Sequence, residues 1–246
     1  RRLDGTAVPW QAGRAHVLVD TPEKAEGLSH VSDTLIGQFV GLKTDPRREL
    51  ILISPYFVPR NIGTQWLHYL RAQGVRVRIL TNSLAANDVP LVHAGYARYR
   101  MPLLEAGIEI HELKPVPNRA SSRRRTLGSG SSRASLHAKS FVFDREKVFV
   151  GSFNFDPRSA ILNTELGLLI ENPLLSAQVA AMAEQAMRPV NSYRVDLARN
   201  PDGEAMLTWT GVNDGRVRVL GQEPESSAWQ RFMLKLLSAL PIEENL

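Results

Sequence analysis

Cysteine is absent from this sequence of 246 residues, and so is any apolar run of about 18 residues, the length that crosses a membrane. Without cysteine the chain has neither a disulfide framework nor a thiolate metal site. The first residues, Arg1 to Asp4, resemble neither a signal peptide nor a natural start, so we expect a piece of a longer protein. Hydrophobic residues make up 43% of the chain, enough for a substantial core.

Acidic residues are missing from the segment 115–135, which consists mainly of Ser, Gly, Pro and Arg and predicts a mobile loop. The chain has 30 basic and 25 acidic residues, and five of the basic ones lie in this segment: Arg119, Arg123, Arg124, Arg125 and Arg133. Because the rest of the chain is balanced in charge, we predict no general nucleic-acid partner. The loop either attracts anionic lipid head groups or is a solvated insertion.

The order of apolar patterns indicates an α/β fold with a mostly parallel mixed sheet flanked by helices. Strand-like runs "ELILISP", "VRVRIL" and "IEIHEL" alternate with helical patterns over 31–42, 62–73 and 89–106. Ligands of such sheets bind beyond the carboxyl ends of the strands. This rule draws attention to "SPYFVP" (54–59) and "TNSLAAND" (81–88).

The C-terminal part of the sequence has a different pattern, with short strands separated by turn residues. A strand "LGLLIE" and a helix over 173–187 precede three strand patterns separated by Pro-Asp-Gly and Asn-Asp-Gly, which predict a small antiparallel meander. A final helix over 229–240 has an apolar stripe that either docks on the core or contacts a membrane. We expect residues 1–30 to be a connector with one strand at 15–19, and residues 31–246 to form one catalytic domain.

Chemistry-bearing side chains gather in "SLHAKSFVFDREKVFVGSFNFD", Ser135 to Asp156. His137 and Lys139 lie two apart on a predicted strand, so their side chains leave the same face. Lysine does not ligate metals at neutral pH, so the pair favours an anionic substrate, most naturally a phosphate, and no metal. The imidazole attacks phosphorus or protonates the leaving oxygen, while Lys139, Ser152 and Asn154 hold the phosphate oxygens.

Two further residues of this stretch have backbone roles. Asp144, at the far end of the predicted strand, is better placed as a structural anchor than as a general base. Gly151 allows the backbone to approach closely where a side chain would block it.

The spacing of these residues resembles the signature HxKx4Dx6GSxN of the phospholipase D superfamily: His137, Lys139, Asp144, Gly151, Ser152 and Asn154. The stretches "LISPYFVP", "NTELGLLIEN" and "WQRFMLKLLSALPIEENL" look like the C-terminal half of bacterial cardiolipin synthases, particularly those of Gram-negative bacteria. This resemblance covers nearly the whole chain.

The resemblance implies a phospholipase D-like fold and a phosphatidyltransferase of phospholipid biosynthesis that works through a phosphatidyl-histidine, without metal or cofactor. It implies phospholipid substrates and peripheral association with the anionic surface of the bacterial inner membrane, on its cytoplasmic face. The resemblance implies catalytic roles for His137, Lys139, Asp144 and Glu165. Glu165 matches a family carboxylate that orients the histidine. Phosphate binding passes to Lys139, Ser152 and Asn154.

The sequence departs from the family pattern because it holds one such motif, whereas the family builds its site from two. The partner is therefore an N-terminal half that carries the first motif, or a second copy of the chain, and the connector-like residues 1–30 favour the first option. In two-motif relatives the C-terminal histidine is the general acid, which assigns that role to His137. We expect the isolated fragment to be inactive as a monomer.

Two other functions compete with this interpretation: a phosphodiesterase or nuclease of the same superfamily, and a membrane-docking module that is inactive on its own. The basic residues have no interleaved aromatics for stacking bases, which disfavours the nuclease. His93 either contacts substrate or packs in the core. Tyr56 and Phe57 line the acyl or glycerol side of the cleft or belong to the core.

Overall fold

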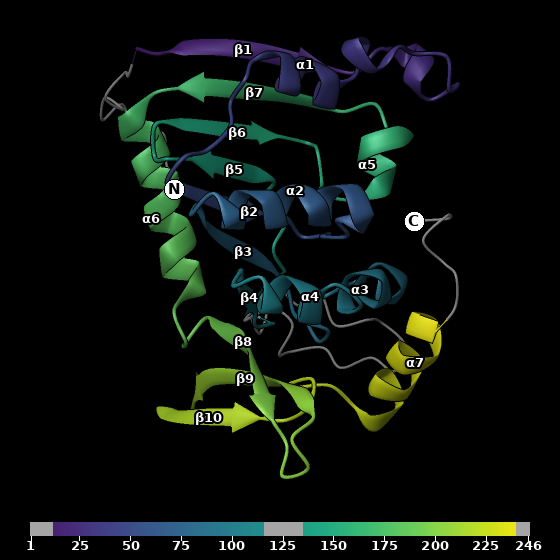
Figure 1. Cartoon of the computed structure of the whole chain (residues 1–246), viewed down its shortest axis with the longest axis vertical. Coiled ribbons are helices and arrows are strands. Elements are labelled where there is room, and N and C mark those ends of the chain that lie inside the picture. The colour runs from purple at the N-terminus through teal and green to yellow at the C-terminus, as the bar shows by residue number, and fades with distance from the viewer. Residues whose placement is uncertain (1–11, 116–134, 240–246) are drawn as a thin grey trace, which may run out of the picture.

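The chain folds into a single mixed sheet with helices on both faces (Figure 1). The computed structural model describes residues 12–115 and 135–239. In this part of the chain ten strands lie in the order β1-β7-β6-β5-β2-β3-β4-β8-β9-β10. The predicted α/β class with a mixed sheet is confirmed. The predicted loop over 115–135 lies outside the described residues except at its two ends.

The centre of the sheet is parallel. It consists of β2 (Glu49–Ile53), β3 (Arg76–Asn82) and β4 (Glu109–Leu113), with α2 (Arg60–Ala72) as the crossover between β2 and β3. β2 is a nearly continuous apolar run because both of its faces are covered, whereas β3 also buries the polar side chains of Arg78, Thr81 and Asn82. The parallel part is smaller than we predicted, because the strands on either side of it, β5 (Ser140–Phe143) and β8 (Ser192–Arg199), run antiparallel to β2 and β4.

One flank of the centre is antiparallel: β5 (Ser140–Phe143), β6 (Lys147–Gly151), β7 (Leu166–Glu171) and β1 (Arg14–Val19). Asp144 and Arg145 join β5 to β6 with positive φ angles of 54° and 58°, as a type I′ hairpin turn requires. β1 lies within the predicted connector, yet it forms the outer strand of this flank. Residues 14–19 are therefore part of the sheet.

The other flank contains the predicted meander, made of β8 (Ser192–Arg199), β9 (Ala205–Asn213) and β10 (Arg216–Leu220). β8 pairs with β4, so the meander extends the main sheet and is no separate body. The predicted final helix is α7 (Ala228–Ala239), and its Leu234 packs with Leu84 and Ala94.

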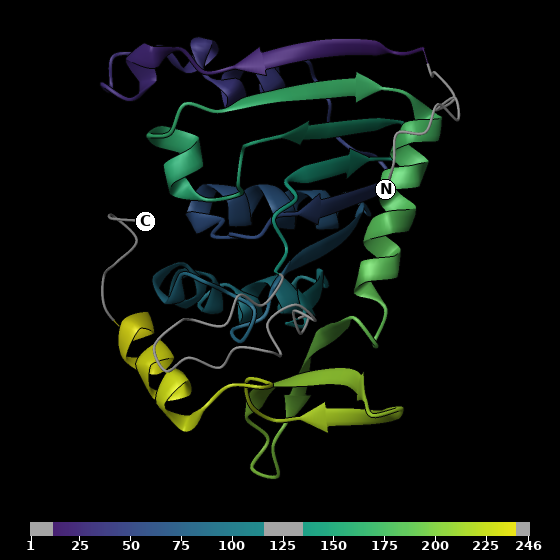
Figure 2. The ribbon, with the colours of Figure 1, turned by 180° about the vertical axis from the view of Figure 1, so that it is seen from behind.

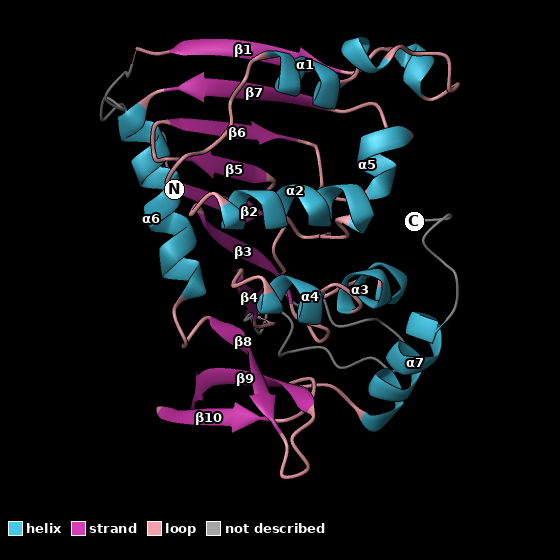
Figure 3. Cartoon of the chain, viewed as in Figure 1, coloured by secondary structure: helices cyan, strands magenta, loops and turns pink. Residues whose placement is uncertain are grey.

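The helix predicted over 89–106 is two helices, α3 (Pro90–Ala97) and α4 (Arg100–Glu105). Pro102 lacks the N–H that would donate to the carbonyl of Arg98 in a continuous helix, so the helix is interrupted between Ala97 and Arg100. Figure 3 separates these helices from the strands. The remaining helical elements are η1 (Pro22–Lys24), η2 (Val31–Asp33), α1 (Leu35–Gly41), α5 (Pro157–Ile161) and α6 (Pro173–Met187).

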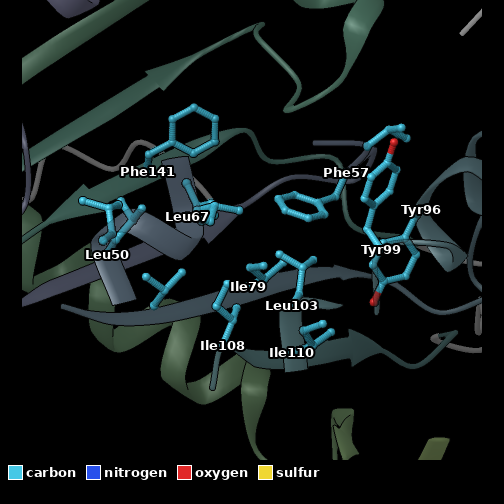
Figure 4. Packing of buried hydrophobic residues seen from close by; sticks show 14 of the residues in the cluster. Leu50, Phe57, Leu67, Ile79, Tyr96, Tyr99, Leu103, Ile108, Ile110 and Phe141 are labelled. Atoms are coloured by element: carbon cyan, nitrogen blue, oxygen red, sulfur yellow. The ribbon is translucent and has the colours of Figure 1, made fainter. Parts of the chain in front are cut away.

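Two apolar layers hold the helices to the sheet. On one face, side chains from α1, α2 and α4 pack against the strands, with Leu67 and Leu103 fully buried (Figure 4). On the opposite face, α6 packs Ala180 and Met187 against the strands (Figure 2). α6 begins where Pro173 follows Asn172, whose side chain accepts a hydrogen bond from the Leu175 amide at 2.9 Å.

Candidate active site

Five predicted site residues meet at one edge of the sheet, which we name the carboxyl edge. It is formed by the ends of β2, β3 and β6 and the beginnings of β5 and β7. The residues that lie there are His137, Lys139, Ser152, Asn154 and Glu165. His137 and Lys139 precede β5 and are not on the strand itself, contrary to our prediction.

Asn82, at the end of β3, fixes the backbone just before His137. Its fully buried amide accepts a hydrogen bond from the Leu136 N–H at 3.0 Å and donates one to the Leu136 carbonyl at 3.2 Å. The sequence analysis did not single out Asn82, although it lies in the "TNSLAAND" segment to which the strand-end rule points. His137 itself is exposed at this edge.

Lys139 lies among carboxylates. Its ammonium donates to the carbonyl of His137 at 3.1 Å. Burial lowers the pKa of Lys139, and the carboxylates of Glu165, Asp156 and Asp88 oppose that shift. The lysine is thus a half-buried cation, and its charge faces the space beside the histidine.

Glu165 is buried, and its carboxylate accepts hydrogen bonds from two serines. The Ser159 hydroxyl donates to Oε1 at 2.7 Å and the Ser152 hydroxyl donates to Oε2. Its backbone N–H donates to the Asp20 carboxylate at 2.9 Å. His137 is not among its hydrogen-bond partners in the described residues, so the orienting role of Glu165 stays a prediction.

Ser152 and Asn154 differ in what they offer a ligand. The Ser152 hydroxyl is engaged with Glu165 and also accepts the Leu166 N–H at 3.0 Å. The side-chain oxygen of Asn154 is buried and has no hydrogen-bond partner among the described residues. Such groups are rare in folded proteins, and this amide oxygen can accept only from a hydrogen-bond donor.

Gly151 lies where β6 and β7 approach most closely. A Cβ at this position would stand 2.4 Å from the carbonyl oxygen of Leu166 and 2.7 Å from the Cα of Gly167. The structure therefore shows the close backbone approach that we predicted for this glycine.

Asp144 lies at the opposite end of β5, away from the carboxyl edge. Its carboxylate accepts hydrogen bonds from the backbone amides of Arg47, Arg48 and Glu49 at 2.9, 2.7 and 2.8 Å. Burial acts to raise the pKa of Asp144, but these three amides hold it below its usual value. The carboxylate pins the start of β2 to the β5–β6 turn.

Tyr56 and Asp88 form a polar pair beside the site. The Tyr56 hydroxyl donates to Asp88 at 2.9 Å, and burial together with Asp88 raises the pKa of Tyr56 to about 12. Phe57 belongs to the core, where its ring stacks on Phe155 at a centroid distance of 5.1 Å. Asp88 and Asp156 were missed in the sequence, and the signal that locates Asp88 is its place after β3.

His93 is fully buried in a charged cluster. Its Nε2 is 2.6 Å from an Arg100 nitrogen, and Arg100 also pairs with Glu112 at 2.9 Å and with Glu223. The structure thus supports the packing interpretation of His93.

The two features that we linked to membranes are only partly visible. All five arginines of the predicted loop lie outside the described residues. In α7, Trp229 and Phe232 are 66% and 56% exposed and their rings stack at 5.6 Å, while Leu234 is buried. No helix in residues 12–115 and 135–239 is long and apolar enough to cross a membrane.

Comparisons with known proteins identify relatives of this chain. The family model described as cardiolipin synthase, PLD-like domain, matches residues 44–187. Cardiolipin synthase C of Escherichia coli K12 is 39% identical over 98% of this chain and 50% of its own length. An uncharacterised Helicobacter pylori protein (strain 26695) is 29% identical over 96% of this chain and 44% of its own length. The chain spans about half the length of these relatives.

Solved structures share the fold at low identity. Phosphatidylserine synthase of Haemophilus influenzae superposes with a TM-score of 0.55 and 17% identity, covering 94% of this chain and 46% of that protein. NucT of Helicobacter pylori gives a TM-score of 0.50 and 16% identity over 72% of this chain and 96% of that protein. The matched family model covers more than half of the chain, which therefore belongs to the family of cardiolipin synthase, PLD-like domains.

Proposed function

We propose that this chain supplies half of the active site of a phosphatidyltransferase that transfers a phosphatidyl group through a phosphatidyl-histidine. The observation that carries the proposal is the convergence of His137, Lys139 and Asn154 from two chain segments at the carboxyl edge. One phosphate held there meets an imidazole and an ammonium, and the side-chain NH₂ of Asn154 is the group of this residue that can donate to a phosphate oxygen.

The reaction has two displacements. A histidine nitrogen on a second domain attacks phosphorus while the bond from phosphorus to the leaving alcohol breaks, and His137 gives its proton to that alcohol oxygen. An acceptor hydroxyl then returns a proton to His137 and attacks phosphorus, and the bond from phosphorus to nitrogen breaks. Lys139 offsets the negative charge that grows on the phosphate oxygens in both steps.

The remaining site residues support these steps. Glu165 orients the imidazole of His137 once its carboxylate turns from Ser152 toward the ring. Ser152 is then released toward the phosphate. Asp144 holds the hairpin that presents His137 and Lys139, and contributes through position alone.

The substrates are phospholipids, and the enzyme associates peripherally with the cytoplasmic face of a bacterial inner membrane. The exposed pair Trp229 and Phe232 on α7 suits the interfacial region of a bilayer, where aromatic rings are favoured. The arginines of segment 115–135 add attraction to anionic head groups.

Turnover of radiolabelled phosphatidylglycerol by the complete enzyme tests the proposal, with phosphatidylglycerol, phosphatidylethanolamine or water offered singly as acceptor. We expect a lipid product with an intact chain and none with His137→Asn. Hydrolysis of a nucleic acid or of a simple phosphodiester with no turnover of lipid would support the phosphodiesterase alternative instead.

A further inference from the structure

Asp20 and Lys24 form a buried ion pair beside Glu165. The Lys24 ammonium donates to the Asp20 carboxylate at 2.6 Å, and the two side chains are 2% and 0% exposed. Both residues follow β1, and Lys24 ends η1, in the segment that we expected to be a connector. Lysine and aspartate are almost never fully buried unless they are paired, so this pair marks the segment as a defined part of the fold.

The ion pair contacts both ends of the segment 159–165. Asp20 exchanges two hydrogen bonds with Glu165: its backbone N–H donates to the Glu165 carbonyl at 2.9 Å, and its carboxylate accepts the Glu165 N–H at 2.9 Å. Lys24 donates to the Ser159 carbonyl at 2.8 Å. Figure 1 shows α5, which contains Ser159, next to the purple segment that follows β1. The pair therefore holds the backbone of Ser159 and of Glu165.

Ser159 and Glu165 are also joined through their side chains. The Ser159 hydroxyl donates to Oε1 of Glu165 at 2.7 Å and accepts the Asn154 N–H at 3.2 Å. One serine thus connects a proposed phosphate-binding residue to the proposed orienting carboxylate. Because the pair fixes Ser159 and the Glu165 backbone, Oε1 has a defined position, whereas Oε2 binds the Ser152 hydroxyl. Oε2 is therefore the oxygen that can turn toward His137.

Stability alone does not account for a buried pair of this kind. The loss of hydration of two charges largely offsets their attraction, and apolar side chains of similar volume often stabilise a fold equally well. Apolar side chains would, however, leave the Glu165 N–H and the Ser159 carbonyl without these buried hydrogen bonds. The pair is thus suited to fixing the positions of these two residues, beyond any contribution to stability.

We propose that Asp20 and Lys24 are positioning residues of the active site, which act through Glu165 and do not touch the substrate. The inference rests on the proposed function, in which Glu165 orients the His137 imidazole. A carboxylate that is held by its backbone and by one oxygen orients an imidazole more accurately than a carboxylate without such support. The segment after β1 thereby supports the chemistry, although Lys24 lies 135 residues before Ser159 in the sequence.

The double variant Asp20→Asn/Lys24→Met tests the proposal in the complete enzyme. It removes both charges together, so neither is left buried without its partner, and circular dichroism checks that it is folded. We expect kcat for transfer from labelled phosphatidylglycerol to fall about 10–100-fold, the loss typical of replacing a group that orients a metal-binding histidine. KM should stay within about twofold, because the residues proposed to hold the phosphate are unchanged. Glu26→Gln, exposed in the same segment, is the matched control and should keep the wild-type kcat.

The same double variant in a Glu165→Gln background distinguishes positioning from a general structural effect. Once the carboxylate is absent, the pair has no group left to position, so we expect the further loss in kcat to be less than about threefold. Ser159→Ala breaks the link from the pair to Oε1 without removing a charge, and it should show the same pattern even if the double variant does not fold. An unchanged kcat in these variants, or an equal fold-loss in both backgrounds, would overturn the proposal.

Hydrolysis of bis(4-nitrophenyl) phosphate, a simple phosphodiester, is measured on the same samples to separate this proposal from the proposed function. Hydrolysis with the same non-additive losses, but without transfer of lipid, would contradict phosphatidyl transfer and support the positioning role. An enzyme that turns over neither substrate would contradict both proposals.

Discussion

At the scale of single residues, Glu165 has two candidate roles, and its carboxylate already accepts two hydrogen bonds from serines. In the structure it accepts hydrogen bonds from Ser152 and Ser159, whereas the proposed reaction asks it to orient His137. In the proposed reaction the Ser152 hydroxyl and the His137 imidazole therefore compete for the same carboxylate.

Replacing these two residues should give losses of different size. We expect His137→Ala to lower the rate of lipid transfer by about 10²–10⁴-fold or more, because it removes the proton donor. Glu165→Gln should retain part of the activity, since the imidazole remains but is poorly oriented. The measurement is turnover of labelled phospholipid by the complete enzyme. Equal losses in the two variants would give Glu165 a direct chemical role.

Lys139→Met should resemble the loss of His137. The ammonium is half-buried and opposes the negative charge of the phosphate in the transition state, where a charge in a site shielded from water has its largest effect. Initial rates at saturating lipid are the measurement, and Lys147→Met, on the far end of β6, is the control. A wild-type rate in Lys139→Met would contradict the proposed role of this residue in binding the phosphate.

At the scale of elements, the β5–β6 hairpin carries the chemistry at one end and its anchor at the other. Lys139 precedes β5, Asp144 follows it, and four residues separate them. The three amides that bind Asp144 belong to the segment leading into β2. Replacement of Asp144 should therefore loosen the β5–β6 hairpin without changing the residues that we propose to bind phosphate.

Asp144→Asn should lower the free energy of unfolding by about 1–3 kcal/mol at neutral pH, because the amide side chain accepts these hydrogen bonds poorly. The native carboxyl has a lowered pKa, so its contribution is complete above about pH 3.9 and disappears as pH falls through the lower native pKa. The difference between wild type and variant in urea unfolding should shrink on acidification. Glu146→Gln, exposed in the same turn, should change little, and a difference that grows at low pH would contradict the anchor.

The sequence predicted the elements whose patterns are local. The runs "ELILI" and "VRVRIL" became β2 and β3, and the signature residues His137 and Lys139 lie at the carboxyl edge. Asn82 and Asp88 were not recognised, because their roles depend on contacts with residues distant in sequence. The exposure of Leu166 and Leu168 beside the buried Leu169 was not predicted either, since burial on one side and exposure on the other cannot be distinguished in a run such as "LGLLI".

At the scale of the whole molecule, Arg100 connects the α/β centre to the C-terminal meander. Its guanidinium is fully buried between Glu112 on β4 and Glu223 after β10, and lies 5.4 Å from the ring of Trp209 on β9. Burial acts to raise the pKa of Glu223, but Arg100 and His93 lower it to about 2. These contacts fix the meander to the central part of the sheet.

Arg100→Met should destabilise the chain by about 3–5 kcal/mol, because it leaves two buried carboxylates without their cation. Arg76→Met, which breaks an exposed pair with Glu109, should cost less than about 1 kcal/mol. Thermal or urea unfolding monitored by circular dichroism measures both. Equal effects would show that the buried cluster contributes no more than a surface pair.

The pairing of β1 with β7 also sets an order of folding. β1 is synthesised before the other described strands, and its partner strand begins at Leu166, about 150 residues later, so at about 5–20 residues per second β1 waits roughly 8–30 s on the ribosome. Only when β7 has emerged does Asp20 meet the backbone of Glu165. The carboxyl edge is therefore finished late in biosynthesis, and a nascent chain that stalls before β7 exposes an unpaired apolar strand to chaperones and proteases.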